Sequence, residues 1–390
     1  MHRLKRFFVL ALVVMVAVQA FPKATLALTV SAKSAVLIEQ STGKVLYEKN
    51  AHERLPMAST TKIMTAICAI EHADLAGVVT VDARAVGVEG SSMYLEKGEH
   101  LTLEDLIYGL MLSSGNDAAV AIALHISGDI DSFAQLMNET AQKIGAKNTS
   151  FRNPNGLDHS EHYTTAYDLA LITRYGMEFE KFREIVATPS KKVPWESRGY
   201  DRSLTNHNKM LKIYEGADGV KTGFTKKSGR CLVSSATRDG MQAIAVTLNA
   251  PDDWNDHTHM LDYAFDTYHM EPVFQKGDYV RTVTVKNSEV KEMKMITTDG
   301  VEVPVKHGEK PDVVVELRTP GYLDAPVGFE DEMGGVEVYF EGNLLKKISV
   351  VSAAYAPVIE SMQFAKNLKH ILQEWISFET DYMAYGKRPG

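Results

Sequence analysis

The sequence is poor in cysteine, since Cys68 and Cys231 are the only two among its 390 residues. Two cysteines do not provide the framework of several disulfides that stabilises small exported domains. Cys68 lies on the apolar side of an expected helix, and Cys231 lies in a strand-like run. We therefore expect both to be small buried hydrophobic residues rather than metal ligands or nucleophiles.

An excess of positive charge is also lacking, because the formal net charge at pH 7 is -8. This balance argues against a nucleic-acid partner and against broad electrostatic attachment to anionic lipid. Hydrophobic residues make up 45% of the chain and charged residues 24%, which are ordinary values for a globular protein. The composition therefore supports neither a disordered chain nor a repeat architecture.

A long apolar run is missing, because the stretch Phe7–Phe21 falls short of the roughly 20 residues that span a membrane. This stretch follows a basic cluster that ends at Arg6, and it precedes Thr25-Leu26-Ala27. That order is typical of a secretory signal, so we expect residues 1–27 to be removed and the mature chain to begin near residue 28. The alternative is an N-terminal anchor that stays uncleaved.

Residues 28–390 are long enough for two domains, and the residue pattern changes near residue 273. Residues 28–272 mix strand-like and helical patterns. Residues 273–357 form short alternating segments, such as Val280 to Val285, which are punctuated by Gly and Pro. This pattern predicts a small β-sandwich. Because it contains no cluster of catalytic residue types, we expect it to act as a spacer.

In the first block, helical patterns lie between an early and a late strand hairpin. The hairpins are expected at Ala35 to Tyr47 and, around the turn Arg238-Asp239-Gly240-Met241, at Cys231 to Leu248. The helical patterns cover residues 103–112, 117–126, 131–144 and 166–175. This order predicts a mixed α/β domain, in which one antiparallel sheet is built from both ends of the block with helices on both sides.

One stretch has the residue types of a nucleophilic serine site. Ser59 is followed by Lys62 and a long apolar run, which predicts a helix with both side chains on one face of its first turn. The N–H groups and dipole of a helix start stabilise an oxyanion, and a neutral lysine can take the serine proton. Ser41 and Ser288 share the Ser-x-x-Lys spacing, but only Ser59 opens such a helix. The alternative is that Ser59 merely caps the helix.

Two later motifs fit the same kind of site. Ser114 and Asn116 lie where one helical pattern ends and the next begins, which predicts a tight turn exposed to a cleft. A hydroxyl there can relay a proton, and an amide can hold a lysine. Lys221, Thr222 and Gly223 lie at a strand edge, where a substrate backbone can approach and a carboxylate can bind. Each motif taken alone is also an ordinary turn sequence.

The order Ser59-x-x-Lys62, Ser114-Gly115-Asn116 and Lys221-Thr222-Gly223 resembles the penicillin-binding and serine β-lactamase superfamily. Within this superfamily, the chain is similar to the low-molecular-mass D-alanyl-D-alanine carboxypeptidases of the penicillin-binding protein 5 type. Residues 153–157, 163–168 and 206–208 also support the resemblance. It covers nearly the whole mature chain, although in the second domain it rests on position and strand pattern.

The resemblance implies removal of the terminal D-alanine from peptidoglycan pentapeptide stems, with β-lactam antibiotics as covalent inhibitors. It implies that Ser59 attacks the penultimate D-Ala carbonyl, that Lys62 accepts its proton, and that Ser114 relays a proton to the leaving amine. Asn116 would position Lys62 and the substrate. No metal and no cofactor is implied.

The resemblance also assigns the groups that bind substrate. Lys221 and Thr222 would hold the substrate carboxylate, and the charge of Lys221 would lower the pKa of the base. The backbone N–H groups of Ser59 and Phe224 would form the oxyanion hole. Some relatives carry an arginine on or just after the strand that follows the Lys-Thr-Gly motif, whereas residues 251–257 here contain none. Carboxylate binding would then rest more on Lys221 and Thr222.

Two other functions stay open at this point. A β-lactamase-like hydrolase is disfavoured, because no Glu-x-x-Leu-Asn stretch follows the Ser-x-Asn motif to supply the deacylating base of one large class. A non-catalytic module that binds β-lactams or peptidoglycan would tolerate loss of Lys62 or Ser114. Both residues are present.

The C-terminal segment has a third pattern. After Pro357, apolar residues such as Leu372 and Trp375 recur at helical spacing over residues 358–378. Because charges interrupt the segment, it is expected to lie in a membrane interface rather than to cross the bilayer. The resemblance implies the outer face of the cytoplasmic membrane. The alternative is a helix packed on the β-rich domain. Residues 379–390 are expected to be a tail.

Overall fold

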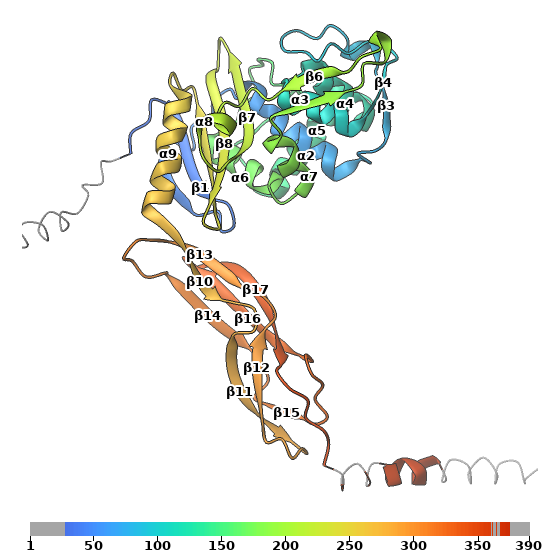
Figure 1. The fold of residues 1–390 in the computed structure, drawn as a ribbon, viewed down its shortest axis with the longest axis vertical. Coiled ribbons are helices and arrows are strands. Elements are labelled where there is room, and N and C mark those ends of the chain that lie inside the picture. The colour runs from blue at the N-terminus through green and yellow to red at the C-terminus, as the bar shows by residue number, and fades with distance from the viewer. Residues whose placement is uncertain (1–27, 360, 362–363, 365–366, 375–390) are drawn as a thin grey trace, which may run out of the picture.

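The structure, a computed structural model, describes residues 28–374 apart from residues 360, 362–363 and 365–366. Figure 1 shows a broad domain of helices and strands above an elongated β domain. The expected signal segment, residues 1–27, and the expected tail, residues 379–390, lie outside the described residues. Part of the expected terminal helix, including Trp375, also lies outside them.

A five-stranded antiparallel sheet forms the centre of the first domain, with the strand order β2-β1-β9-β8-β7. Its strands are β1 (Ser34–Glu39), β2 (Val45–Lys49), β7 (Ala217–Thr225), β8 (Gly229–Arg238) and β9 (Met241–Leu248). Because β1 pairs with β9, the first and last parts of the domain lie side by side. This confirms the predicted sheet built from both ends of the block.

The side chains of β1 alternate between two cores, as the pleat of a strand requires. Val36 and Ile38 enter one core with helices from the middle of the chain, whereas Ala35 and Leu37 enter a second core under α9. The helices of the first core are α2 (Lys62–His72), α3 (Leu103–Leu112), α4 (Asn116–Ser127), α5 (Ile130–Ile144), α6 (Ala166–Gly176) and α7 (Glu180–Ala187), and α9 (Asp253–Thr267) covers the other face. Helices therefore lie on both faces of the sheet, as predicted.

The four helical patterns predicted from the sequence match α3, α4, α5 and α6 to within one residue at each end. Helices α7 and α9 were not expected; polar residues fill half of the positions of α7 and nine of the fifteen positions of α9. The remaining short elements of the domain are η1 (Ala58–Thr61), η2 (Ala83–Ala85), η3 (Glu196–Arg198), α8 (Met210–Ile213), β3 (Val78–Thr80), β4 (His100–Thr102), β5 (Ser190–Val193) and β6 (Arg202–Thr205).

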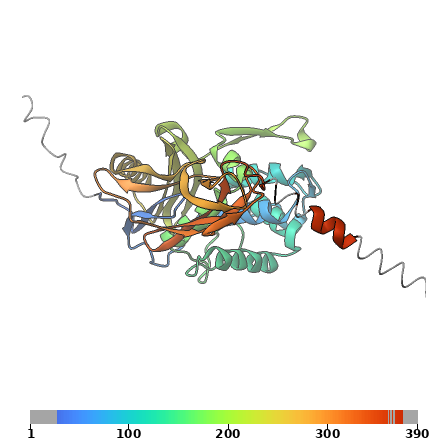
Figure 2. The same cartoon turned by 90° about the horizontal axis from the view of Figure 1, so that it is seen from below.

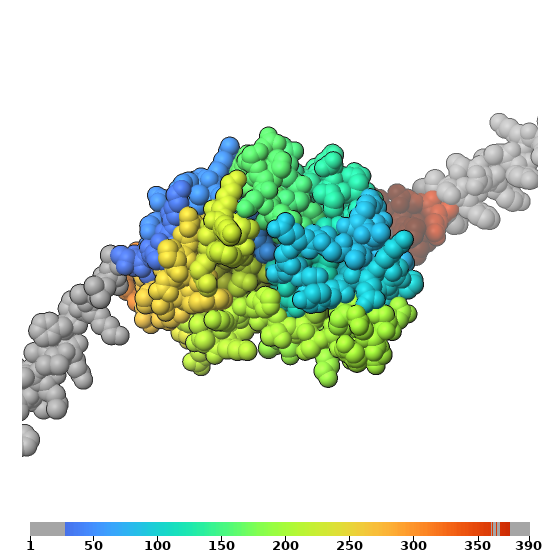
Figure 3. All heavy atoms as spheres, turned by 90° about the horizontal axis from the view of Figure 1, so that it is seen from above, coloured from blue at the N-terminus to red at the C-terminus, as the bar shows by residue number. Residues whose placement is uncertain are grey.

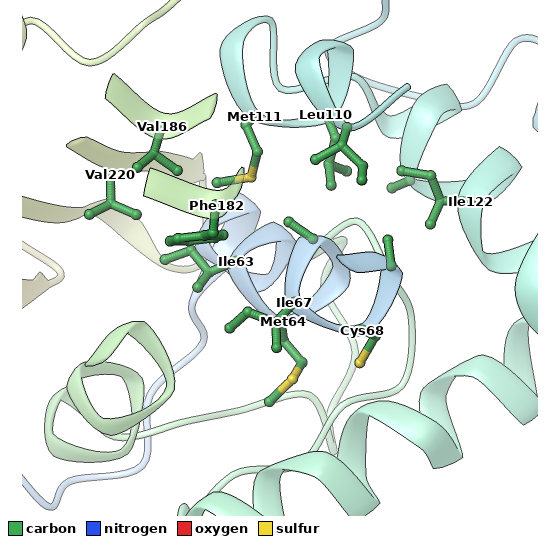
Figure 4. Close-up of a cluster of buried hydrophobic side chains, with 14 of the residues drawn as sticks. Ile63, Met64, Ile67, Cys68, Leu110, Met111, Ile122, Phe182, Val186 and Val220 are labelled. Atoms are coloured by element: carbon green, nitrogen blue, oxygen red, sulfur yellow. The ribbon is translucent and has the colours of Figure 1, made fainter. Parts of the chain in front are cut away.

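Helix α2 is surrounded by protein on all sides, because every residue from Lys62 to Ala69 is buried. Figure 4 shows Ile63, Met64 and Ile67 of this helix among apolar side chains from α3, α4, α7 and β7. A helix that is apolar around its whole circumference is stable only inside a core. The packing consequently fixes the first turn of α2, and with it Lys62.

The second domain contains only strands among its described residues up to residue 352: β10 (Tyr268–Phe274), β11 (Tyr279–Lys286), β12 (Glu292–Thr297), β13 (Val301–Lys306), β14 (Val313–Arg318), β15 (Tyr322–Asp324), β16 (Glu332–Phe340) and β17 (Asn343–Ser352). A β-rich domain is therefore confirmed. Six strands form one sheet, in the order β14-β16-β17-β12-β11-β15, and β10 pairs with β13. Side chains of β11, β12, β15, β16 and β17 share one core, so the large sheet curves around it. The sequence predicted that the β-rich domain begins at residue 273, and this position lies inside β10.

The two domains meet at the hairpin of β1 and β2. Lys44 in this hairpin forms an ion pair of 2.8 Å with Glu341, and its ammonium lies 5.1 Å from the ring centre of Phe340. Figure 2 shows the β domain from below, in front of the first domain.

In the described part of the chain, no helix combines the length and the apolar character needed to cross a membrane.

Removal of side-chain volume from α2 should destabilise the first domain. We expect Ile67→Ala, at a fully buried position, to lower the free energy of unfolding by about 2–5 kcal/mol, because it removes apolar contacts and leaves a cavity. Urea unfolding followed by circular dichroism measures this change. Val78→Ala is the control, since Val78 is 62% exposed, and should cost less than about 1 kcal/mol. Equal losses in the two variants would contradict the central role of α2 in the core.

Candidate active site

Ser59 lies in η1, directly before α2, and the backbone there has an unusual conformation. Ala58 has a φ of 48°, and its carbonyl accepts a hydrogen bond of 2.8 Å from Thr61 Oγ1. Gly156 packs under this carbonyl so closely that a Cβ atom would lie 1.9 Å from the Ala58 oxygen. Gly156 also has a φ of 89°, so only glycine fits there. The position of Ser59 thus depends on a glycine nearly a hundred residues later.

The amine of Lys62 lies at the centre of a small hydrogen-bond network. Lys62 Nζ donates to Ser59 Oγ at 2.9 Å, to Asn116 Oδ1 at 2.6 Å and to the backbone oxygen of Asn155 at 2.7 Å. Lys62 has no exposed surface, and all three partners are neutral groups. The distance of 2.9 Å between Lys62 Nζ and Ser59 Oγ also fits the reverse hydrogen bond, in which the serine hydroxyl donates to a neutral amine.

Burial lowers the pKa of Lys62 well below the ordinary value of lysine, and the charge of Lys221 lowers it further. Asp117 acts in the opposite direction. Burial also lowers the pKa of Lys221, to about 7, and its Nζ donates to the backbone oxygen of Thr222 at 3.0 Å. The environment therefore favours the neutral amine that a general base needs.

The turn between α3 and α4 carries Ser114, whose φ of 58° is rare for a residue other than glycine. Strained backbone of this kind is often found at functional sites. Asn116 Nδ2 donates to the Glu89 oxygen at 2.5 Å, so the amide that contacts Lys62 also anchors the loop before α3. Asp117 holds the same loop by accepting hydrogen bonds from the backbone N–H groups of Met93 and Leu95, each at 3.0 Å. The sequence did not indicate this role for Asp117.

Strand β7 passes directly beside η1 at Gly223. A Cβ atom on Gly223 would lie 3.0 Å from the Ser59 nitrogen and 3.1 Å from the Met57 oxygen. A larger residue would push the two segments apart. The backbone of β7 around Phe224 consequently lies beside the nitrogen of Ser59, where the sequence placed the oxyanion hole.

A pocket of about 310 Å³ opens above these residues. Five of the predicted site residues line it, namely Ser59, Ser114, Thr222, Gly223 and Phe224. Three others, Lys62, Asn116 and Lys221, are buried behind it. Figure 3 shows this face of the domain, where segments near residue 100 meet segments near residues 220–250.

Five further lining residues were not predicted: Ser91, His207, Arg230, Asp253 and Trp254. They come from four segments that are far apart in the sequence, and no local motif connects them. His207 lies in the stretch 206–208 that supported the resemblance, which was the one available signal. Burial and the charge of Lys221 lower the pKa of His207, so its imidazole is neutral near pH 7.

A serine hydroxyl bonded to a buried amine at the start of a helix, and open to a pocket, is the arrangement of a serine acyl-transfer enzyme. Residues 20–252 match the D-alanyl-D-alanine carboxypeptidase family, and residues 268–356 match the C-terminal domain of penicillin-binding protein 5. The chain belongs to this family of low-molecular-mass penicillin-binding proteins and is a serine D-alanyl-D-alanine carboxypeptidase that acts on peptidoglycan.

The similarity to known members extends over both domains. The chain is 36% identical to the D-alanyl-D-alanine carboxypeptidase DacF of Bacillus subtilis, over 92% of this chain and 93% of that protein. It is 31% identical to DacC of Escherichia coli, over 82% of each chain. The crystal structure of penicillin-binding protein 5 from Haemophilus influenzae covers 84% of this chain and 98% of its own length, at 25% identity and a TM-score of 0.65.

The electrostatic coupling of the two buried lysines can be tested by the pH dependence of acylation. We expect the rate of penicillin acylation to rise with pH through a transition below about 10.4, the ordinary pKa of lysine, as Lys62 becomes neutral. Lys221→Met replaces an amine that is charged below its pKa of about 7 with an uncharged side chain of similar length. It should therefore move the transition to higher pH, as measured by stopped-flow acylation between pH 5 and 11.

The control for this experiment is Lys227→Met, which removes an exposed charge from the loop after β7. Its profile should coincide with that of the unaltered enzyme. A transition that stays at the same pH in Lys221→Met would contradict the coupling between the two amines.

Proposed function

We propose that this carboxypeptidase removes the terminal D-alanine of peptidoglycan pentapeptide stems through an acyl-enzyme on Ser59. The observation that carries the proposal is the contact of 2.9 Å between Ser59 Oγ and Lys62 Nζ, in an environment that lowers the pKa of the amine. A neutral Lys62 accepts the hydroxyl proton as Ser59 Oγ attacks the carbonyl carbon of the penultimate D-Ala. A tetrahedral intermediate with a negatively charged oxygen results.

Backbone N–H groups of Ser59 and Phe224 stabilise this oxygen, and fixed donors of this kind often accelerate acyl transfer more than any other single effect. The intermediate then collapses, the amide bond breaks, and the leaving D-alanine nitrogen gains a proton from Lys62 through the Ser114 hydroxyl. Ser114 lines the pocket beside Ser59, which supports this relay. Water next attacks the ester carbonyl and gives a proton to Lys62. Lys62 passes this proton to Ser59 Oγ as the ester bond breaks, which releases the shortened stem with a new carboxyl group and restores the serine hydroxyl and the neutral amine.

Asn116 holds Lys62 in place, because its amide oxygen accepts a hydrogen bond from the amine while its amide nitrogen donates to the backbone oxygen of Glu89. Thr222 lines the pocket and donates a hydrogen bond to the substrate. A β-lactam follows the same first steps, with ring opening in place of loss of an amine. Covalent labelling by penicillin therefore reports acylation without requiring hydrolysis.

Substitution of the proposed nucleophile tests the mechanism. We expect Ser59→Ala to abolish both D-alanine release from a stem pentapeptide and covalent labelling by fluorescent penicillin, because no acyl-enzyme can form. The matched controls are Ser41→Ala and Ser288→Ala, which alter the other two Ser-x-x-Lys sequences. Both should keep labelling and release. Labelling that persists in folded Ser59→Ala would show that another residue is the nucleophile.

We also propose that the enzyme is exported and held on the outer face of the cytoplasmic membrane by its C-terminal helix. Residues 367–374 are helical, and the apolar residues Leu368, Ile371 and Leu372 are exposed. Phe364, one turn earlier, is 70% exposed. Exposed apolar residues at helical spacing favour insertion into an interface over packing on the β domain.

Truncation after Ile359 tests this attachment. The cut keeps Val358, which packs on the β domain, and the hydrogen bond of 3.0 Å from the Ile359 N–H to the Asn287 oxygen. We expect a fully active enzyme that no longer sediments with liposomes, whereas the full mature chain does. Ile371→Glu should weaken sedimentation, and Glu374→Gln should not. Lost thermal stability on truncation, without liposome binding by the full chain, would instead favour a packed helix.

A further inference from the structure

One buried titratable side chain beside the nucleophile has no part in the mechanism described so far. His162 lies in the segment that joins α5 to α6, is only 3% exposed, and its Nε2 lies 2.8 Å from Thr61 Oγ1. Its Nδ1 accepts a hydrogen bond of 3.0 Å from the backbone N–H of Arg152. Burial lowers the pKa of His162 to about 4, with the charge of His159 as a smaller cause, so the imidazole is neutral at pH 7.

The direction of each hydrogen bond around His162 follows from the two ends of the chain. A backbone N–H can only donate, so Nδ1 accepts and the proton of the neutral imidazole lies on Nε2. The carbonyl of Ala58 can only accept, so the hydroxyl of Thr61 donates to it, at 2.8 Å. Thr61 Oγ1 then accepts from Nε2. A continuous chain of hydrogen bonds therefore leads from the backbone of Arg152 through two side chains to the carbonyl of Ala58.

This chain ends on the peptide group that also carries the N–H of Ser59. The Ala58 carbonyl and the Ser59 N–H belong to one planar unit, so a hydrogen bond that fixes the carbonyl also fixes the direction of the N–H. The backbone needs such support, because Ala58 has a φ of 48°, which is rare for a residue other than glycine. Thr61 has no exposed surface, so bulk water cannot replace a donor that is lost.

We propose that His162 is a positioning residue for the oxyanion hole. Its Nε2–H orients the Thr61 hydroxyl toward the Ala58 carbonyl, and this hydrogen bond aims the Ser59 N–H at the oxygen of the tetrahedral intermediate. His162 does not line the pocket, so it acts only through Thr61. The proposal rests on the acyl-enzyme mechanism above, in which that N–H stabilises the oxyanion. The effect should appear in the rate of acylation and not in the binding that precedes it, because the oxygen becomes negative only in the intermediate.

Two substitutions at position 162 separate the two hydrogen bonds. The amide of His162→Gln reaches the place of Nε2 and can donate to Thr61, whereas the shorter amide of His162→Asn reaches only the place of Nδ1 and can accept from Arg152. Each variant loses one hydrogen bond, so both should lose similar thermal stability. We expect His162→Asn to lower the rate constant of penicillin acylation by about tenfold or more, with an unchanged dissociation constant of the non-covalent complex. His162→Gln should restore most of the rate.

Thr61→Val breaks the same chain at its middle, and it keeps the test decisive if His162→Asn does not fold. It should slow acylation by a similar factor. The double variant His162→Asn/Thr61→Val should be no slower than Thr61→Val, because effects within one hydrogen-bond chain are not additive. The matched control is His125→Asn, at an exposed position in the last turn of α4, which should acylate at the rate of the unaltered enzyme. Stopped-flow fluorescence with the full mature chain measures these rates.

A boronic acid analogue of an N-acylated D-alanine probes the oxyanion hole directly. Its boron takes the Ser59 oxygen as a fourth ligand and becomes a tetrahedral anion that resembles the intermediate. We expect its inhibition constant to rise in His162→Asn by about the factor by which acylation slows. An inhibition constant that stays the same while acylation slows would contradict a role in the oxyanion hole.

Equal slowing of acylation in His162→Asn and His162→Gln would overturn the proposal, since it would show that the histidine only supports the fold. Unchanged acylation in folded Thr61→Val would also overturn it. Ser59→Ala keeps this test separate from that of the nucleophile: persistent labelling there would contradict the acyl-enzyme on Ser59, whereas the comparison of the two variants at position 162 judges the positioning role alone.

Discussion

The cost of holding a charge away from water is the constraint on which this site depends. Lys62 is fully buried, and its three partners are a hydroxyl, an amide oxygen and a backbone carbonyl. These groups orient an amine without supplying the negative charge that would keep it protonated. A carboxylate in any of the three places would stabilise the ammonium and remove the base. The absence of an acid among these partners therefore matters as much as the hydrogen bonds that they form.

Asp117 shows how an acid can lie close to such a site. Its charge raises the pKa of Lys62, against the effects of burial and of Lys221. Its oxygens, however, accept from Ser92 Oγ at 2.6 Å and from the N–H groups of Met93 and Leu95. Donors of this kind offset a negative charge locally. Asp117 thus fixes the loop at the edge of the pocket while its influence on the amine stays smaller than the effects that lower the pKa.

The sequence predicted those parts of the structure that depend on local patterns. Helices α3 to α6 and the two hairpins follow from apolar spacing and turn residues, and the predicted site residues fall around one pocket. The contributions of Gly156 and His162 could not be found in this way. Gly156 matters because its backbone touches the carbonyl of Ala58, and His162 because its Nε2 lies beside Thr61 Oγ1. Both depend on contacts between distant segments, which neither periodicity nor motif spacing encodes.

Lysine and arginine have different tasks here because their charges respond differently to burial. The amines at Lys62 and Lys221 can lose a proton when they are desolvated, and burial brings the pKa of Lys221 to about 7. An arginine at either position would stay charged, so it could not accept the serine proton, and burial would not make it neutral. Arg230, by contrast, lines the pocket with a partly exposed side chain, and an arginine there keeps its charge at every physiological pH. The depth of each cation thus decides whether its charge is adjustable, as at Lys62 and Lys221, or permanent, as at Arg230.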